Sequence, residues 1–317
     1  MNEINTQTFL NFKNKIIENC SRAILGKDET ITLVLTSFIC SGHVLIEDIP
    51  GTGKTMLLRA FAKSIGFDFK RVQFTPDLLP SDILGINFYN QKSGEFEFKK
   101  GPLFSNIVLA DEINRATPRT QSSLLEAMEE GQISIDGKTY MLDSPFMVMA
   151  TQNPIESYGT FPLPDAQIDR FFIKVSMGYM KREEELEVIS RASTVNIIEN
   201  LNEVITKEET GYVKENYKNI KVSEDVKNYI MDIVEKTRSE ESGFNSGVSA
   251  RGSIALYKAC QAFAALSGRD FVIPEDVKYL APYVLLHRLG IGGIRTSSPK
   301  ELFDEMLKEV KVPAEEV

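Results

Sequence analysis

The chain has 317 residues, of which 42% are hydrophobic and 26% are charged, and its formal net charge is −9. This length favours a main domain of roughly 150–200 residues and a smaller one, with no need of a metal or disulfide to stabilise the core. The acidic balance argues against general binding to nucleic-acid backbones, and the apolar run 31–40 (ITLVLTSFIC) is too short to span a bilayer.

The first residues, MNEINTQTF, lack the charged and apolar regions of a signal peptide. The cysteines Cys20, Cys40 and Cys260 are far apart and form no CxxC pair. We interpret them as reduced, packed thiols, and we expect a cytoplasmic protein.

Short apolar runs alternate with helical patterns through the first half of the chain, as in a βα domain. After residues 171–180 (FFIKVSMGYM) these runs stop. Apolar residues then recur at spacings of three and four in 223–236, 250–266 and 275–289, which indicates helices. The predicted domains are therefore 1–178 and 179–317, with the boundary near Gly178.

Residues 48–55 (DIPGTGKT) nearly match the phosphate-binding pattern G-x-x-x-x-G-K-T, with Asp48 in place of the first glycine. A buried strand (HVLIE, 43–47) precedes this loop, and an apolar-periodic helix runs from Lys54 to Gly66. A strand–loop–helix unit directs backbone N–H groups and a helix N-terminus at one point, which suits a phosphate. The expected nucleotide-binding residues are Pro50, Gly51, Thr52, Gly53, Lys54, Thr55 and Met56.

Each residue type suits its expected role in that loop. Lys54 would reach the β- and γ-phosphates, Thr55 would place its hydroxyl on Mg²⁺, and the glycines would allow turns that a Cβ would block. Asp48 stands at the loop entry, where aspartate tolerates unusual backbone angles. The alternative is a turn without a ligand.

A second apolar run, 106–112 (NIVLADE), ends in the pair Asp111–Glu112. An aspartate at a strand end can hold Mg²⁺, and the adjacent glutamate can polarise water for attack on the γ-phosphate. Ligands gather at the carboxyl ends of strands in an open α/β sheet. A solvated acidic turn is the alternative.

A third apolar run, 145–154 (PFMVMATQNP), ends in Thr151, Gln152 and Asn153. The amide of Asn153 can hydrogen-bond the γ-phosphate or orient the attacking water without adding negative charge. Asn153–Pro154 is also a common turn pair, and both interpretations can hold.

Two stretches alternate apolar and polar residues about a turn pair and predict β-hairpins. One spans 86–104 about Ser93–Gly94, and the other spans 131–142 about Asp136–Gly137. Each could serve as a sheet edge or a flap.

Taken together, Lys54–Thr55, LADEINRA, ATQNP, LPDAQIDRF and SARGSIAL have the order and spacing of an AAA+ ATPase. The chain resembles the MoxR family more narrowly, through 111–137 and 150–171, and the resemblance runs from about Gly26 to the C-terminus. One departure is Ala250, where many relatives have proline, and it concerns only the local start of a helix. The resemblance implies a five-stranded parallel αβα domain, two hairpin insertions facing a pore or substrate, and a helical lid.

The resemblance also implies roles for residues that the motifs leave open. Arg170, expected in a short helix, looks like an arginine finger for a neighbour's ATP, and Arg251 looks like the lid arginine that contacts the γ-phosphate. A planar guanidinium suits both tasks, although either arginine could form an ordinary surface ion pair. Arg115 and Arg119 are rival candidates, and Gly26 would border adenine or simply break a helix.

The expected activity is Mg²⁺-dependent ATP hydrolysis in a ring, a hexamer by resemblance, which remodels or matures a partner protein. The resemblance implies a partner with a von Willebrand factor A domain, or a role in metal insertion. The alternatives are a nucleic-acid motor, which the acidic charge disfavours, a metal-chelatase motor subunit, and a scaffold that binds ATP without turnover. The intact Glu112 and Asn153 argue against the scaffold.

Overall fold

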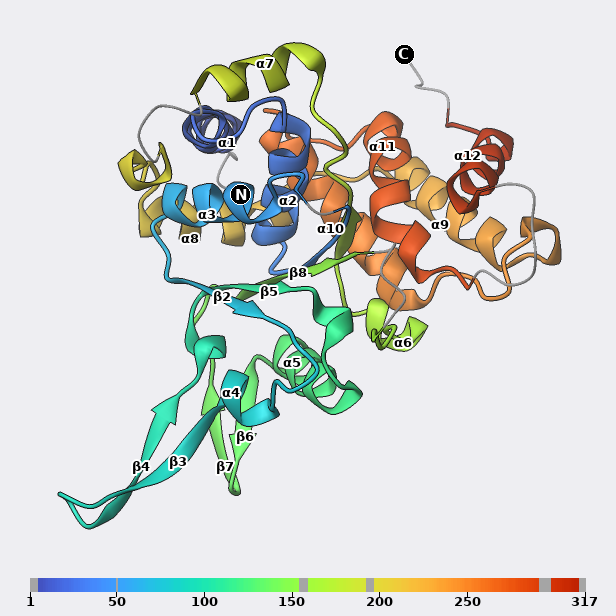
Figure 1. The fold of residues 1–317 in the computed structure, drawn as a ribbon. Coiled ribbons are helices and arrows are strands. Elements are labelled where there is room, and N and C mark those ends of the chain that lie inside the picture. The colour runs from blue at the N-terminus through green and yellow to red at the C-terminus, as the bar shows by residue number, and fades with distance from the viewer. Residues whose placement is uncertain (1–4, 50, 154–158, 192–196, 291–297, 314–317) are drawn as a thin grey trace.

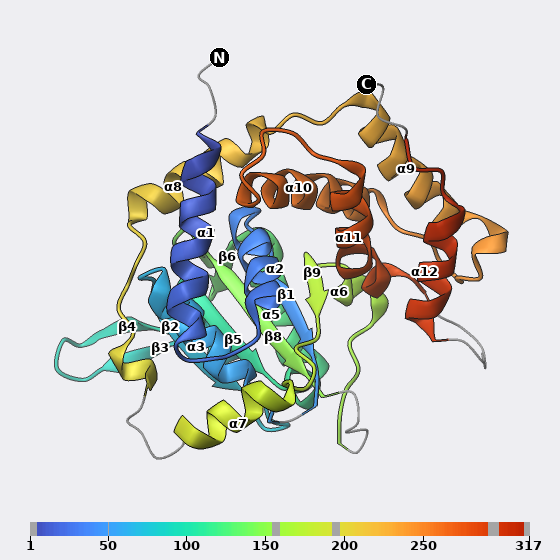
Figure 2. The same ribbon diagram turned by 90° about the horizontal axis from the view of Figure 1, so that it is seen from above.

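The structure is a computed structural model, and it describes residues 5–49, 51–153, 159–191, 197–290 and 298–313. Within these ranges, no helix is both long enough and apolar enough to cross a membrane. Figures 1 and 2 show a central sheet with helices on both faces, two hairpins at one end and a helical region at the other.

The central sheet has five parallel strands in the order β2-β5-β8-β1-β9. Their bounds are Val44–Glu47 (β1), Phe69–Gln73 (β2), Ile107–Asp111 (β5), Met147–Gln152 (β8) and Ile173–Val175 (β9). The strands that carry the three predicted motifs, β1, β5 and β8, are neighbours in the sheet, so their carboxyl ends meet at one edge.

Alternate residues of the strands face opposite layers, and each layer is buried by helices. Ile107 and Leu109 of β5 pack with the helices α1, α2 and α3, whereas Val108 and Ala110 pack with α4 and α5. The bounds are Thr6–Ser21 (α1), Asp28–Ile39 (α2), Lys54–Ser64 (α3), Pro80–Leu84 (α4) and Pro118–Glu130 (α5). The predicted αβα domain is therefore confirmed.

Both predicted hairpins form, and they project together from the α4–α5 side of the sheet (Figure 1). The first consists of β3 (Gly85–Asn90) and β4 (Glu95–Lys100), and the second of β6 (Gln132–Ile135) and β7 (Lys138–Met141). Asp136 and Gly137 both have positive φ, 49° and 76°, as the tight turn between β6 and β7 requires.

After β9 the described chain is helical, which confirms the predicted lid. The short helix α6 (Asp165–Ile168) precedes β9. The helices that follow β9 are α7 (Arg182–Arg191), α8 (Lys207–Asn216), α9 (Glu224–Arg238), α10 (Ala250–Leu266), α11 (Pro274–Leu285) and α12 (Pro299–Glu309). Short 3-10 turns join them, including η3 (Ile197–Asn200) and η6 (Leu286–Arg288). α8 and α10 pack against α1 and α2, so one continuous hydrophobic cluster joins the sheet to the lid.

Candidate functional site

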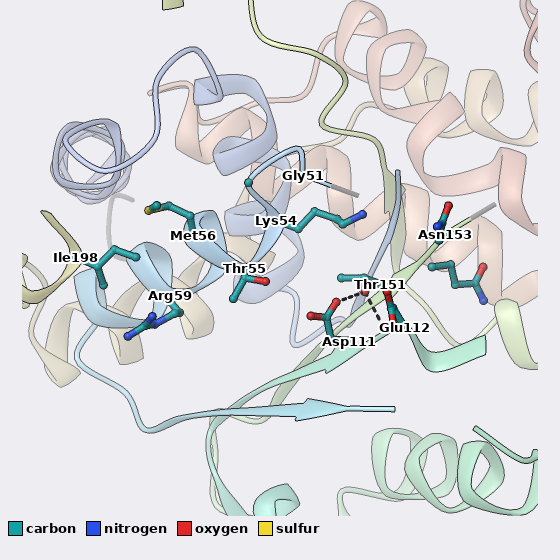
Figure 3. A pocket seen from close by; sticks show the side chains of 12 residues that line it. Gly51, Lys54, Thr55, Met56, Arg59, Asp111, Glu112, Thr151, Asn153 and Ile198 are labelled. Carbon is teal, nitrogen blue, oxygen red and sulfur yellow. Dashed lines mark hydrogen bonds between the residues drawn. The ribbon is translucent and has the colours of Figure 1, made fainter. Parts of the chain in front are cut away.

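A cavity of about 450 Å³ lies where β1, β5 and β8 end and α3 begins. The residues that line it come from segments far apart in the chain (Figure 3). Of the predicted site residues it includes Gly51, Gly53, Lys54, Thr55, Met56, Asp111, Glu112 and Asn153. The structure thus brings the three predicted motifs together around one space.

The loop before α3 has the backbone that the motif requires. Gly51 and Gly53 both have φ of +87°, a conformation that residues with a Cβ rarely adopt. Lys54 is the first residue of α3, and its Nζ donates to the carbonyl oxygens of Asp48 and Ile49 at 2.8 and 2.9 Å. Thr52 of the loop is buried, and its hydroxyl donates to the Ile49 carbonyl at 3.3 Å. Pro50 lies outside the described residues.

Thr151 connects the two acidic residues at the end of β5. Its hydroxyl donates to Oδ1 of Asp111 at 2.6 Å and accepts the backbone N–H of Glu112 at 2.8 Å (Figure 3). Glu112 has a φ of +57°, which is unusual for a residue with a side chain and recurs at functional sites. Thr151 therefore fixes the carboxylate of Asp111 and the backbone of Glu112 at the cavity.

The neighbouring strand β2 adds two partners that the sequence did not reveal. The Arg71 guanidinium forms an ion pair with Oδ2 of Asp111 at 2.7 Å, and Nε2 of Gln73 donates to Oε2 of Glu112 at 2.7 Å. Arg115 lies 3.2 Å from the same carboxylate oxygen of Glu112. Arg71 and Gln73 could have been found only from the strand order, because β2 is adjacent to β5 in space but not in the chain.

Two further residues line the cavity without a preceding signal in the sequence, Arg59 of α3 and Ile198 of η3. Ile198 follows α7, so the chain returns to the cavity after leaving β9. The predicted residue Gly26 does not line the cavity. It has a φ of +65° and lies against the carboxylate of Glu184, while nearby Ile24 approaches Gly53.

Arg170 and Arg251 lie together, away from the cavity that contains Lys54. Both guanidinium groups pair with the carboxylate of Glu129 at the end of α5, and both line a separate cavity of about 390 Å³. Asp169 pairs with Arg251 at 3.7 Å and with the buried Arg288 at 2.6 Å. The lid is thereby joined to the α5–α6 side of the core.

The predicted helical position of Arg170 needs a correction. α6 ends at Ile168, so Arg170 lies in the turn that follows. The chain must turn here because Arg288 binds the carbonyl and carboxylate oxygens of Asp169, and Phe172 donates its N–H to the His43 carbonyl as β9 begins. Arg251 is the second residue of α10, as predicted, and Arg119 is exposed on α5.

The donor set fits a magnesium ion that is shared with phosphate groups. Thr55 and Asp111 offer one hydroxyl and one carboxylate on the same cavity. Within the described ranges no group of three His, Cys, Asp or Glu could hold a metal ion. Mg²⁺ commonly binds through one or two protein oxygens together with substrate phosphates and water.

Comparisons with known proteins agree with this geometry. Residues 43–173 match the model of the ATPase family associated with various cellular activities (AAA), and residues 236–309 match the AAA lid domain. The uncharacterized protein YeaC of Bacillus subtilis is 51% identical over 95% of this chain and 95% of its own length. Chaperone MoxR1 of Mycobacterium tuberculosis is 39% identical over 94% of this chain and 82% of its own.

A solved crystal structure leads to the same family. The protein, from Cytophaga hutchinsonii and provisionally described as an ATPase, is 38% identical and superimposes with a TM-score of 0.87 over 97% of this chain and 98% of its own. These similarities extend across the sheet, the hairpins and the lid. The chain therefore belongs to the MoxR family of AAA+ ATPases.

Proposed function

We propose that this ATPase hydrolyses ATP with Mg²⁺ in the cavity at the ends of β1, β5 and β8. The observation that carries the proposal is that Lys54, Thr55, Asp111, Glu112 and Asn153 line one space although they span about a hundred residues of sequence. Phosphoryl transfer requires groups that bind phosphate, hold a metal ion and position the attacking water. The cavity offers a cation, a hydroxyl, two carboxylates and an amide for these tasks.

Each residue of the cavity has a proposed role that follows from its functional group. The loop N–H groups of residues 51–56 and the Lys54 ammonium would bind the phosphates, as a helix N-terminus and a lysine do in other phosphate loops. Thr55 and Asp111 would hold Mg²⁺, which supplies charge neutralisation on the phosphate oxygens. Glu112 would polarise the attacking water, and Asn153 would orient that water or the γ-phosphate. Gly26 stays a candidate for the border of the adenine site.

We propose that Arg170 and Arg251 both act on the nucleotide of a neighbouring subunit. Both bind Glu129 on one face of the subunit, and neither lines the cavity with Lys54. A head-to-tail ring, hexameric by resemblance, would bring this face to the neighbour's cavity. Charge on the transferred phosphoryl group would then draw both guanidinium groups away from Glu129.

The energy of hydrolysis would serve a partner protein in the cytoplasm. The name of the similar Chaperone MoxR1 supports a chaperone-like role, and the projecting hairpins offer a surface for a client. The family resemblance adds a partner with a von Willebrand factor A domain, or assistance with metal insertion, as the finer hypothesis. The proposed domains are 1–178 for the nucleotide and 179–317 for the lid.

Two substitutions test this proposal. Lys54→Ala should abolish ATP binding measured by calorimetry, while Glu112→Gln should bind ATP normally and hydrolyse it at least ~100-fold more slowly, the scale of a general base. Glu95→Gln, on the exposed hairpin strand β4, is the matched control and should retain wild-type turnover. Unchanged binding in Lys54→Ala would refute the phosphate-loop assignment. The Glu112→Gln variant with bound ATP should also retain partner proteins in a pulldown.

A further inference from the structure

Asp48, which replaces the first glycine of the phosphate-loop pattern, has a buried side chain. Its exposed fraction is 8%. Oδ2 accepts the backbone N–H groups of Met177 and Gly178 at 2.8 and 2.9 Å, and Oδ1 accepts the N–H of Ile49 at 2.9 Å. The carboxylate therefore joins the base of the phosphate loop to the segment that leaves β9 toward the lid.

The ammonium of Lys27 binds the carbonyl groups of the same segment. The side chain is only 5% exposed, and Nζ donates to the carbonyl oxygens of Met177, Gly178 and Tyr179 at 2.7, 3.4 and 3.3 Å. We call residues 177–179 the connector. The Asp48 carboxylate binds N–H groups of the connector, and the Lys27 ammonium binds its carbonyl groups. Gly178, with a φ of +60°, provides the bend at the centre of the connector.

A buried charge is costly unless it is fully hydrogen-bonded. Among the described residues, the hydrogen-bond partners of Lys27 all lie in the connector, and those of the Asp48 carboxylate lie in the connector and at Ile49. A shift of the connector would therefore remove all these partners of Lys27 and two of the three partners of Asp48. Lys54, the expected phosphate ligand, donates to the backbone carbonyl of Asp48 itself. Phosphate oxygens that compete for the Lys54 ammonium would therefore act on the residue that holds the connector.

We propose that Asp48 and Lys27 are positioning residues that fasten the connector to the phosphate loop, so that the two segments respond together when nucleotide binds. This inference rests on the proposed function for its nucleotide-dependent part. The hydrogen bonds themselves do not depend on it. Glycine at position 48 would complete the sequence pattern but would leave the amides of Met177 and Gly178 without this acceptor.

The first test measures amide hydrogen exchange of the connector without nucleotide. Asp48→Gly should accelerate exchange at Met177 and Gly178 by at least about tenfold, because hydrogen bonds to a charged group are among the stronger ones. Asp48→Asn, which keeps one carbonyl oxygen, should give an intermediate acceleration. Lys27→Met, which keeps the apolar stem, should also accelerate exchange in the connector.

Lys214→Met is the matched control for Lys27→Met. Lys214 is partly buried, its ammonium likewise donates to a backbone carbonyl, that of Phe38, and that carbonyl lies outside the connector. Its replacement should leave connector exchange unchanged. If Asp48→Gly fails to fold by circular dichroism, the conservative variants Asp48→Asn and Lys27→Met decide the question alone. Wild-type exchange in the connector of the folded variants would overturn the proposal.

The second test adds a non-hydrolysable ATP analogue. In the wild type we expect the analogue to change connector exchange, and in folded Asp48→Gly we expect it to bind with similar affinity and leave the connector unaffected. Turnover should fall while the Kd holds, a separation that general destabilisation would not produce. A connector in Asp48→Gly that responds like the wild type would overturn the coupling. If the wild type fails to bind the analogue, the proposed function is refuted instead. The hydrogen-exchange comparison without nucleotide would still test whether Asp48 and Lys27 hold the connector.

Discussion

Glu112, the proposed general base, is held by side chains of its own subunit. Gln73 donates to its Oε2 at 2.7 Å, and the Arg115 guanidinium lies 3.2 Å from the same oxygen. Its backbone also adopts a left-handed conformation, with φ of +57°. Both contacts are to Oε2, so a reorientation of the carboxylate toward an attacking water would break at least one of them.

We predict that Gln73→Leu, which keeps a similar size and removes the donor, raises basal ATP turnover. A hydrogen bond to a charged group contributes about 1.5 kcal/mol or more, which corresponds to about tenfold in rate. ATP affinity measured by calorimetry should stay unchanged. Gln7→Leu serves as the control, because Gln7 is exposed on α1 and its Nε2 donates to Asn11. Turnover at or below the wild-type rate would show that Gln73 supports Glu112 rather than restrains it.

The residues of the cavity were predictable where their positions depend on local sequence. The glycines and Lys54 follow from one strand–loop–helix pattern, and Asp111 and Glu112 follow from the end of one apolar run. The contacts of Asp48 were not predictable, because its partners Met177 and Gly178 lie 129 and 130 residues away. Arg71 was missed for a similar reason, since only the strand order places it beside Asp111.

At the scale of elements, His43 joins three parts of the core domain. It precedes β1, its Nε2 lies 3.0 Å from the carbonyl of Met128 in α5, and its Nδ1 accepts the N–H of Val148 in β8 at 2.9 Å. These partners fix a neutral ring with the proton on Nε2. Burial lowers the pKa of His43 to about 4, because the charged form would lose its hydration.

We predict that the protein loses stability as the pH falls from about 6.5 toward 4. The unfolded chain takes up a proton on His43 near pH 6.5, whereas the pKa of His43 in the folded chain is about 4. The stabilisation is therefore complete above pH 6.5 and declines below it, by on the order of 3 kcal/mol. Urea unfolding across this range should show a shallower pH dependence in His43→Gln than in the wild type. Coincident slopes would exclude His43 as the cause.

The two hairpins contact each other through aromatic rings. Phe98 of β4 stacks on Tyr140 of β7 with ring centroids 4.4 Å apart, and Phe104 meets both rings edge-on. Asn87 of β3 also donates to Asp136 in the second turn at 2.7 Å. The turn pairs predicted each hairpin separately, but their contact depends on tertiary packing that no local pattern describes.

We predict that Phe98→Ala and Tyr140→Ala are energetically coupled. Their double-mutant cycle should give about 0.5–1.5 kcal/mol, the range for aromatic pairs, when the opening free energies of the hairpins are measured by hydrogen exchange. Phe96→Ala is the matched control, because its ring packs on Tyr89 of the same hairpin instead. It should add independently to Tyr140→Ala, and additivity of Phe98→Ala as well would contradict the stacking.

At the scale of the whole molecule, the phosphate loop and the arginine pair line separate cavities of the chain. This separation is what the proposed head-to-tail ring would need, because each catalytic centre would then take residues from two copies. The family resemblance implies that Arg251 contacts a γ-phosphate, and its place away from the cavity that contains Lys54 favours the nucleotide of a neighbour.

Mixing experiments distinguish action within a subunit from action across subunits. Lys54→Ala and Arg170→Ala should each lack turnover, and their mixture should recover part of it, because some interfaces join an intact loop to intact arginines. Lys54→Ala with Arg251→Ala should recover turnover in the same way. Activity should rise with total protein concentration as rings form.

The mixture of Arg170→Ala with Arg251→Ala decides the question for Arg251. If both arginines act across the interface, no pair of these subunits offers both, and the mixture should stay inactive. If Arg251 acts within its own subunit, an Arg170→Ala subunit beside an Arg251→Ala subunit should be active. If the Lys54→Ala mixtures stay inactive while mixed rings form, Arg115 and Arg119 become the next candidates.

β9 is a terminal strand of the sheet, and the lid covers it. A terminal strand presents unpaired backbone groups that can recruit strands of other molecules. The opposite terminal strand, β2, carries the exposed charges of Lys70 and Arg71, which discourage such pairing. β9 instead has α11 beside it (Figure 2), and Arg288 of the lid binds the carbonyls of Phe171 and Phe172 at its start. A core domain without its lid should therefore expose β9 together with the apolar surface that the lid covers, and it should aggregate, with light scattering that rises with concentration.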